Sequence, residues 1–155
     1  DWSSDVCSSD LWDLRKVVLL EEKKIKHLEM IQGVINRMAS NSFILKGWTV
    51  TLVAGLLALA GSKSEASLFR IACVPIMIFW GLDSYYLLQE RLYRSLYVKV
   101  CRLSDKDIDF SMSATKAEFG SQKNSLLFCF FSATEFCFYF FLAFSCLALE
   151  FAIVK

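Results

Sequence analysis

Two acidic residues stand inside long apolar runs of this sequence. Asp83 lies in the run Leu68–Leu88, and Glu135 lies in the run Leu126–Val154. An ionisable group within a segment of membrane length costs several kcal/mol unless it is paired or hydrated, so such a group is a functional candidate. Carboxylates at this depth either attract cations or hold neighbouring helices together by hydrogen bonds.

The two acids are expected at similar depths. At about 1.5 Å of helical rise per residue, Asp83 lies about 10 Å from the boundary marked by Glu90 and Arg91, and Glu135 about 15 Å from the same boundary. Hydroxyl groups are predicted in the same half of the membrane, on Thr49, Thr51, Ser84 and Ser132. These six residues form either an ion path or a polar layer that binds helices together, and both interpretations stay open.

The run Asp105, Asp107, Asp109 invites comparison with a calcium-binding loop. An EF-hand loop requires glycine at its sixth position and a bidentate glutamate at its twelfth. Counted from Asp105, these positions are Phe110 and Lys116. The run is therefore interpreted as a solvated acidic turn.

No other catalytic or metal-binding motif is present in the sequence. It contains no phosphate-binding glycine loop, nucleophile elbow or paired histidine and carboxylate, which predicts a protein that is not an enzyme and has no cofactor. His27 is the only histidine and is expected to pack on a helix or to be solvated. No C-x-x-C pair occurs, so neither a metal site nor a disulfide framework is predicted.

The first eleven residues, DWSSDVCSSDL, have an unusual origin. They can be back-translated without a gap into a sequence that resembles the adapter of short-read sequencing libraries. We interpret residues 1–11 as translated adapter and exclude them from fold reasoning; the alternative is a leader rich in serine and aspartate. Without them, 17 basic residues face 13 acidic ones, a net charge of +4. This mild excess does not form the basic stripe of a nucleic-acid binder.

Hydropathy predicts an all-α integral membrane protein with three transmembrane helices. The spans are placed at residues 43–61, 68–89 and 125–154, each long enough to cross about 30 Å of hydrocarbon. Helices of a soluble core are the alternative, but runs that are apolar on every face, in a chain that is 55% hydrophobic, disfavour it.

The distribution of lysine and arginine predicts the orientation. The basic residues concentrate in residues 12–42 and 90–124, whereas the link at 62–67 and the C-terminus have few. By the positive-inside rule, the N-terminus is cytoplasmic, the link is external and the C-terminus is outside.

The segment 12–42 is predicted to form a cytoplasmic amphipathic helix. Leu28, Ile31, Ile35 and Met38 recur at spacings of three and four residues. This face could lie on the membrane, bind a partner, or meet a second stripe on the helical extension of the second span, formed by Leu92, Leu96 and Val100. Packing within the same subunit or its oligomer is the favoured interpretation.

Small residues on the first span predict close helix packing. Gly47, Thr51 and Gly55 recur every four residues, and Ala54 and Ala58 form a second pair of the same spacing. Three helices alone bury little surface and enclose no pore. A homo-oligomer or a complex with a larger partner is therefore expected.

The strings KHLEMIQGVINRMASNSFILKGW and FWGLDSYYLLQERLYRSLY are similar to those of an uncharacterised group of small bacterial membrane proteins. The resemblance covers Lys26–Val100, and it implies a multi-pass protein of the bacterial inner membrane. It implies no activity and no functional residue.

Two functions are compatible with these features. The first is an oligomeric, pore-forming or membrane-perturbing effector in which Asp83 and Glu135 face an ion path. The second is a membrane anchor or adaptor that holds a cytosolic protein through its cytoplasmic helices. The lipid bilayer is the surrounding medium in both.

Overall fold

The computed structural model describes the backbone of residues 2–63, 66–104, 107–120 and 125–154, and most side chains from Leu14 onwards. The described chain is entirely helical apart from its connections. Three helical segments are long and apolar enough to cross a membrane, at Leu14–Gly61, Phe69–Arg102 and Ala133–Ala152. These segments overlap the three spans predicted from hydropathy; the third segment begins eight residues after the predicted start at residue 125. The side chains of residues 1–13, and Asp105 of the predicted acidic turn, lie outside the described residues; Asp107 and Asp109 of that turn are exposed.

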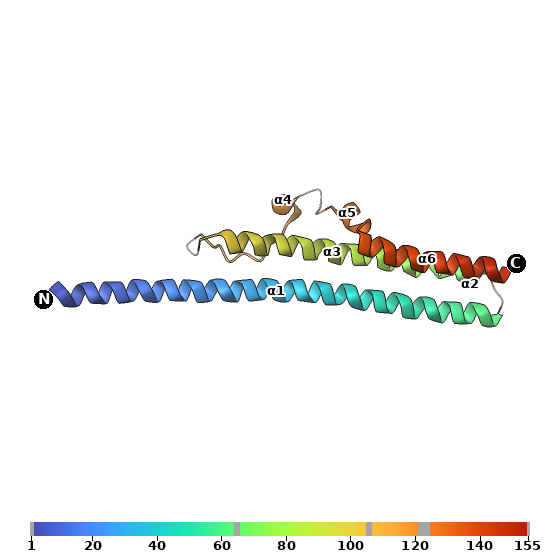
Figure 1. The fold of residues 1–155 in the computed structure, drawn as a ribbon, viewed down its shortest axis with the longest axis horizontal. Coiled ribbons are helices and arrows are strands. Elements are labelled where there is room, and N and C mark those ends of the chain that lie inside the picture. The colour runs from blue at the N-terminus through green and yellow to red at the C-terminus, as the bar shows by residue number, and fades with distance from the viewer. Residues whose placement is uncertain (1, 64–65, 105–106, 121–124, 155) are drawn as a thin grey trace.

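Helix α1 spans Trp2–Lys63 and runs along the whole molecule as one nearly straight rod (Figure 1). It joins the predicted cytoplasmic helix and the first span without a break, because no proline interrupts it and Gly33 is the only helix-weakening residue between Leu14 and Phe43. Its first half is polar and charged, and its second half is apolar.

The second span consists of two helices. Helix α2 covers Ala66–Ile71, and α3 covers Cys73–Arg102. Pro75 explains the break, because a proline has no N–H to donate to the carbonyl group four residues earlier, which belongs to Ile71. Helix α3 then continues past the apolar segment and runs antiparallel to α1 (Figure 1).

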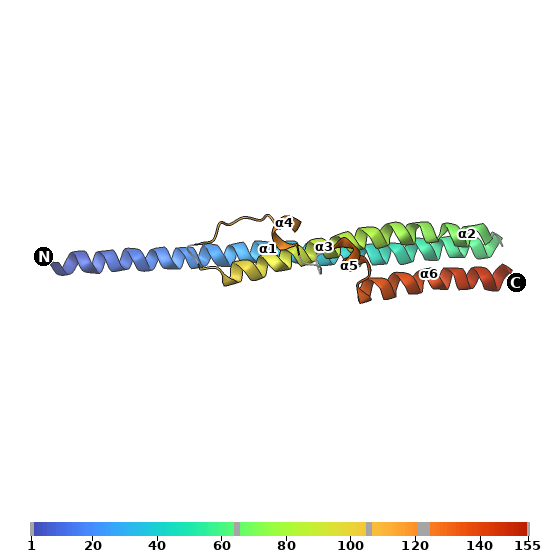
Figure 2. The same cartoon turned by 90° about the horizontal axis from the view of Figure 1, so that it is seen from above.

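The third span is also divided. It consists of α5, Leu126–Phe130, and α6, Ala133–Val154. The short helix α4, Lys116–Phe119, belongs to the connection that precedes this span. Helices α5 and α6 are separated by Phe131 and Ser132, so the predicted single span 125–154 begins with a short separate turn. Helix α6 lies beside the apolar halves of α1 and α3 (Figure 2).

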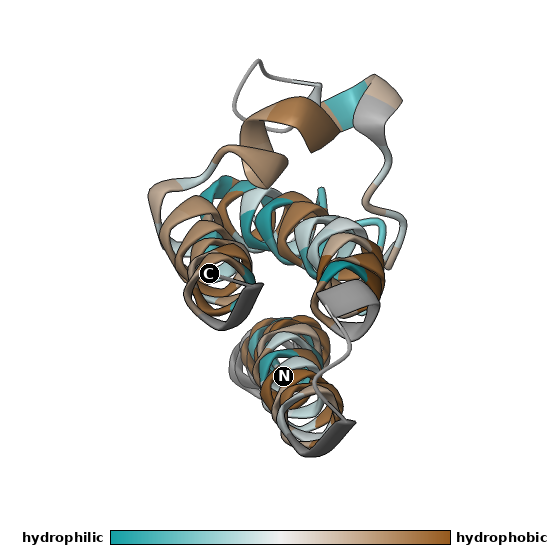
Figure 3. Cartoon of the chain, turned by 90° about the vertical axis from the view of Figure 1, so that its right-hand side faces the viewer, coloured by the Kyte–Doolittle hydropathy of each residue, from teal (hydrophilic) through white to brown (hydrophobic). Residues whose placement is uncertain are grey.

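We call the membrane-length part of the structure the apolar bundle: residues 43–63 of α1, α2, residues 73–88 of α3, α5 and α6. Viewed along its axis, the three long helices form a triangle (Figure 3). Its core takes residues from all three corners, namely Val53, Ala72, Ile76, Trp80, Tyr139 and Cys146. Many large apolar side chains point outward, among them Phe140, Phe141 and Phe144 of α6. Outward-facing phenylalanines suit a hydrocarbon environment.

We call the other part the polar hairpin: residues 14–42 of α1, residues 89–103 of α3 and the segment 107–119. Ile31 and Ile35 of α1 are buried against Leu96 and Val100 of α3. Lys24 donates a hydrogen bond to the carbonyl oxygen of Leu103 at 2.9 Å, which satisfies a carbonyl group at the C-terminal end of α3. Of the three partners considered for the amphipathic face, the structure therefore shows the stripe on α3.

We expect Ile31→Ala to loosen the polar hairpin and to cost about 2–4 kcal/mol, the usual range for a buried isoleucine. Ile31 is fully buried, whereas the adjacent Met30 is 55% exposed, so Met30→Ala is a matched control. Amide hydrogen exchange over residues 89–103 measures the effect. Equal exchange rates in the two variants would contradict this packing.

Candidate functional site

A lysine joins the two intramembrane acids. The Nζ atom of Lys46 in α1 lies 2.5 Å from Oδ2 of Asp83 in α3 and 2.9 Å from Oε1 of Glu135 in α6. Asp83 is fully buried and Glu135 almost so, while the lysine side chain is 24% exposed. One ammonium group therefore connects all three long helices of the apolar bundle. We call Lys46, Asp83 and Glu135 the ion cluster.

Neighbouring polar groups hold the cluster in place. The hydroxyl group of Tyr139 donates to Oδ2 of Asp83 at 3.0 Å, and Lys46 also donates to Oγ of Ser42 at 3.0 Å. Tyr139 follows Glu135 by four residues, so both side chains lie on the same face of α6. Charge-assisted hydrogen bonds of this kind are about twice as strong as neutral ones.

Trp80 positions α6 beside the cluster. Its ring stacks on Phe130 with centroids 4.1 Å apart and on Tyr139 with centroids 5.8 Å apart. Its indole N–H donates to the carbonyl oxygen of Phe130 at 3.1 Å, at the C-terminal end of α5. Trp48 of α1 is exposed, whereas Trp80 is buried among the three helices.

The predicted hydroxyl layer is divided between different environments. Thr49 and Ser84 are buried and donate to the carbonyl groups of Leu45 and Trp80 in their own helices. Ser132 accepts a hydrogen bond from Arg91 at 3.2 Å. Thr51 is exposed and donates to Gly47. The structure thus brings Asp83 and Glu135 together, whereas the hydroxyl groups mainly satisfy local backbone or arginine partners.

The small residues of the first span face outward. Gly47, Thr51, Ala54, Gly55 and Ala58 are all exposed in the single chain. A Cβ atom added at Gly47 or Gly55 would meet no atom within 4 Å, and a shallow groove lies at Ile44, Gly47, Trp48 and Thr51. These residues therefore make no helix contact within the described chain, and their predicted packing role would require another molecule.

His27 has a packing environment rather than a metal-binding one. It is fully buried and meets the ring of Phe110 edge-on, with centroids 5.6 Å apart. Within the part of the chain that the structure describes, no three potential metal ligands lie together. At the other end of the molecule, Glu150 pairs with Arg70 at 3.3 Å.

Sequence reasoning did not identify Lys46 as a member of the site. The lysine lies near the start of an apolar run, where lysine side chains ordinarily extend to the membrane surface. A charge count offered the missing signal, because two acids within membrane spans require compensation and Lys46 is the basic residue inside the first span. As a chemical unit, the cluster can hold helices together and can bind a further positive charge.

Comparison of the chain with protein-family models, with curated proteins and with solved structures finds no match. The function is therefore argued from the geometry of the molecule.

Proposed function

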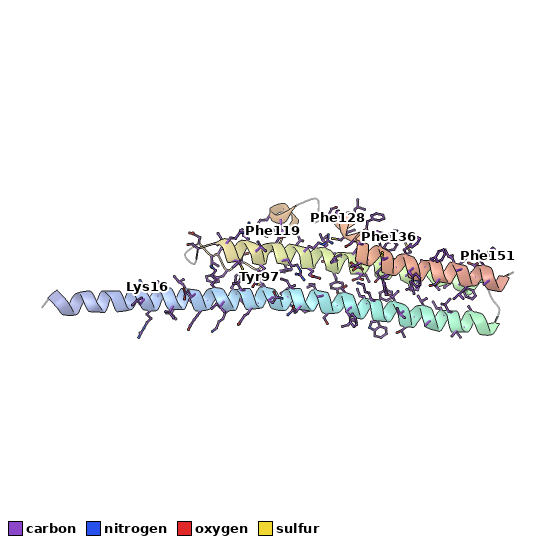
Figure 4. All side chains as sticks on the ribbon, in the orientation of Figure 1. Lys16, Tyr97, Phe119, Phe128, Phe136 and Phe151 are labelled. Carbon is purple, nitrogen blue, oxygen red and sulfur yellow. The ribbon has the colours of Figure 1, made fainter. Side chains whose placement is uncertain are left out.

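We propose that this chain is a non-enzymatic, multi-pass membrane protein that anchors a cytosolic partner through its polar hairpin. The observation that carries the proposal is an exposed apolar stripe on α1, which begins level with the end of α3 and continues beyond it. Leu14, Val18 and Ile25 are 65%, 53% and 56% exposed. Figure 4 shows Lys16 near the N-terminal end of this stripe, where none of the other described elements lies beside α1. Exposed apolar side chains on one face of a helix are typical of a helix-in-groove interaction.

The length of α1 argues against membrane contact by this stripe. Leu14 precedes Lys46 by 32 residues, which is about 48 Å along a continuous helix. Because α1 is nearly straight, its N-terminal part points away from the bilayer in which the ion cluster is buried. The stripe is therefore available to a protein rather than to the lipid surface.

Charge favours an acidic partner over a second copy of this chain. Five basic residues and two acidic residues lie between Arg15 and Lys26. Two such helices side by side in a symmetric dimer would repel each other, whereas a groove with an acidic rim would complement them. The basic residues also support placing this end in the cytoplasm.

The pore-forming alternative receives less support from the same geometry. The outward faces of the described apolar bundle carry few polar residues: Thr51, Tyr85, Thr134 and, at the far end, Arg70. Asp83 and Glu135 point inward to Lys46. An oligomer that associates through these outward faces would not expose a ring of carboxylates.

Site-specific photocrosslinking in the native cells tests the anchor function. A photoreactive residue at Val18 should give one recurrent adduct with a cytosolic protein, while the same residue at Leu82, on the outward face of α3, should give none. With the probe kept at Val18, Leu14→Asp should weaken the adduct and leave the chain in the membrane, since the apolar bundle is unchanged.

Two results would contradict the anchor function. One is a Val18 adduct that contains only a second copy of this chain, which would indicate an oligomer. The other is ion flux through the purified protein in vesicles that is lost in the Asp83→Asn, Glu135→Gln double variant. Such flux would favour the pore instead.

A further inference from the structure

The ion cluster has an unbalanced charge. It contains two carboxyl groups and one ammonium group, so the fully ionised cluster carries a net charge of −1. An uncompensated charge in a low-dielectric interior is strongly disfavoured. Arg91, the next cation along α3 toward the polar hairpin, donates a hydrogen bond to Ser132 at 3.2 Å.

Two oxygen atoms of the cluster lack partners. Oδ1 of Asp83 and Oε2 of Glu135 are buried, and no described group donates a hydrogen bond to either atom. Both side chains are more than nine-tenths buried. Two carboxylates held on one ammonium group repel each other, and a proton on one of them removes that repulsion.

We propose that the ion cluster binds one further proton, carried by the carboxyl group of Glu135 beside the Asp83 carboxylate. This inference goes beyond the anchor function and does not depend on it. The proton comes from water and returns to water when the site is emptied. Proton binding makes the cluster neutral, with one ammonium, one carboxylate and one carboxylic acid.

The partners of each acid assign the proton to Glu135. Asp83 accepts hydrogen bonds from Lys46 of α1 and Tyr139 of α6, and both stabilise its charged form. Glu135 has only the bond from Lys46, opposite the charged Asp83 of α3. Of the two carboxyl groups, Glu135 is therefore the less stabilised as an anion.

A metal ion fits this site less well than a proton. The ammonium group of Lys46 already lies within 2.9 Å of both carboxyl groups, so a metal cation between them would be held beside a like charge. A proton requires no additional coordinating oxygens. The chemistry of the site therefore favours the proton.

Infrared spectroscopy of the full-length protein at neutral pH provides the first test. The wild type should show the carbonyl band of a protonated carboxyl group that is shielded from water. The band should disappear in Glu135→Gln, and it should disappear in Asp83→Asn, because there Glu135 alone must neutralise Lys46. The exposed Glu22 gives a matched control, and Glu22→Gln should retain the band.

The pH dependence of thermal stability gives the second test. If the folded protein binds one more proton than the unfolded chain near neutral pH, its stability must fall as the pH rises. The melting temperature of the wild type should therefore decrease on going from mildly acidic to mildly alkaline pH, relative to that of Glu135→Gln. The difference between the two proteins removes the contributions of the titrating groups that they share.

Three outcomes would overturn the proposal. The first is the absence of a protonated-carboxyl band in the wild type, and the second is its persistence in Glu135→Gln. The third is a melting temperature that rises with sodium concentration at fixed pH in the wild type only, which would identify a metal ion. Should Glu135→Gln fail to fold, the band of the wild type and its loss at alkaline pH still decide the question.

Discussion

Replacement of Lys46 by methionine is expected to lower the melting temperature of the detergent-solubilised protein by about 10 °C. The substitution removes the only ammonium group that contacts Asp83 and Glu135 among the described residues. Removing one partner of a buried ion pair costs about 3–5 kcal/mol, because the remaining charge is left uncompensated. In a chain of this size each kcal/mol corresponds to about 2–4 °C.

Two further variants separate charge from packing in this experiment. Lys26→Met changes an exposed lysine of the same helix and should leave the melting temperature unchanged. Adding Asp83→Asn to Lys46→Met removes the stranded carboxylate and should recover part of the loss. If Lys46→Met proved as stable as the wild type, the ion cluster would not hold the three helices together.

The second large effect is expected at Trp80. Trp80→Ala removes a buried ring that contacts Phe130 and Tyr139 and should cost about 3–5 kcal/mol, as is usual for a truncated core aromatic residue. Trp80→Phe should cost less, since it keeps an aromatic ring and loses mainly the hydrogen bond to the carbonyl group of Phe130. Thermal unfolding followed by circular dichroism measures both effects.

Trp48 supplies the control for this series. It belongs to α1 and is 59% exposed on the outward face of the apolar bundle. Trp48→Ala removes the same side chain without opening a cavity, so its melting temperature should stay close to that of the wild type. Equal losses at Trp48 and Trp80 would mean that the outward face is covered in the assembled protein.

The three spans could be predicted from the sequence because hydropathy is a local property. The breaks within the second and third spans were harder to predict from the sequence. Pro75 is a local signal for the break between α2 and α3, whereas nothing as distinctive marks the break between α5 and α6 at Phe131 and Ser132. The spacing of Leu28, Ile31 and Ile35 predicted an apolar helical face. Periodicity alone could not decide whether that face meets the membrane, another protein or the stripe on α3.

The site was only partly predictable for a different reason. Asp83 and Glu135 could be recognised from their cost in an apolar run. Lys46 could not be assigned to them from local sequence, because its contacts with the two acids cross 37 and 89 residues of chain. Hydropathy averages over a window, and a single lysine near the end of a span has little effect on the average. Helix depth combined with charge balance is the reasoning that connects the three residues.

The uninterrupted course of α1 also has a mechanical consequence. A single helix carries both the stripe at Leu14, Val18 and Ile25 and the ammonium group of Lys46. A continuous helix is stiff in torsion, because its backbone hydrogen bonds connect each turn to the next. A partner that rotates the exposed end of α1 on binding therefore applies torque to Lys46. The ion pairs of Lys46 with Asp83 of α3 and Glu135 of α6 resist that rotation. Helix α1 therefore couples rotation of its exposed N-terminal end to the position of Lys46 in the ion cluster.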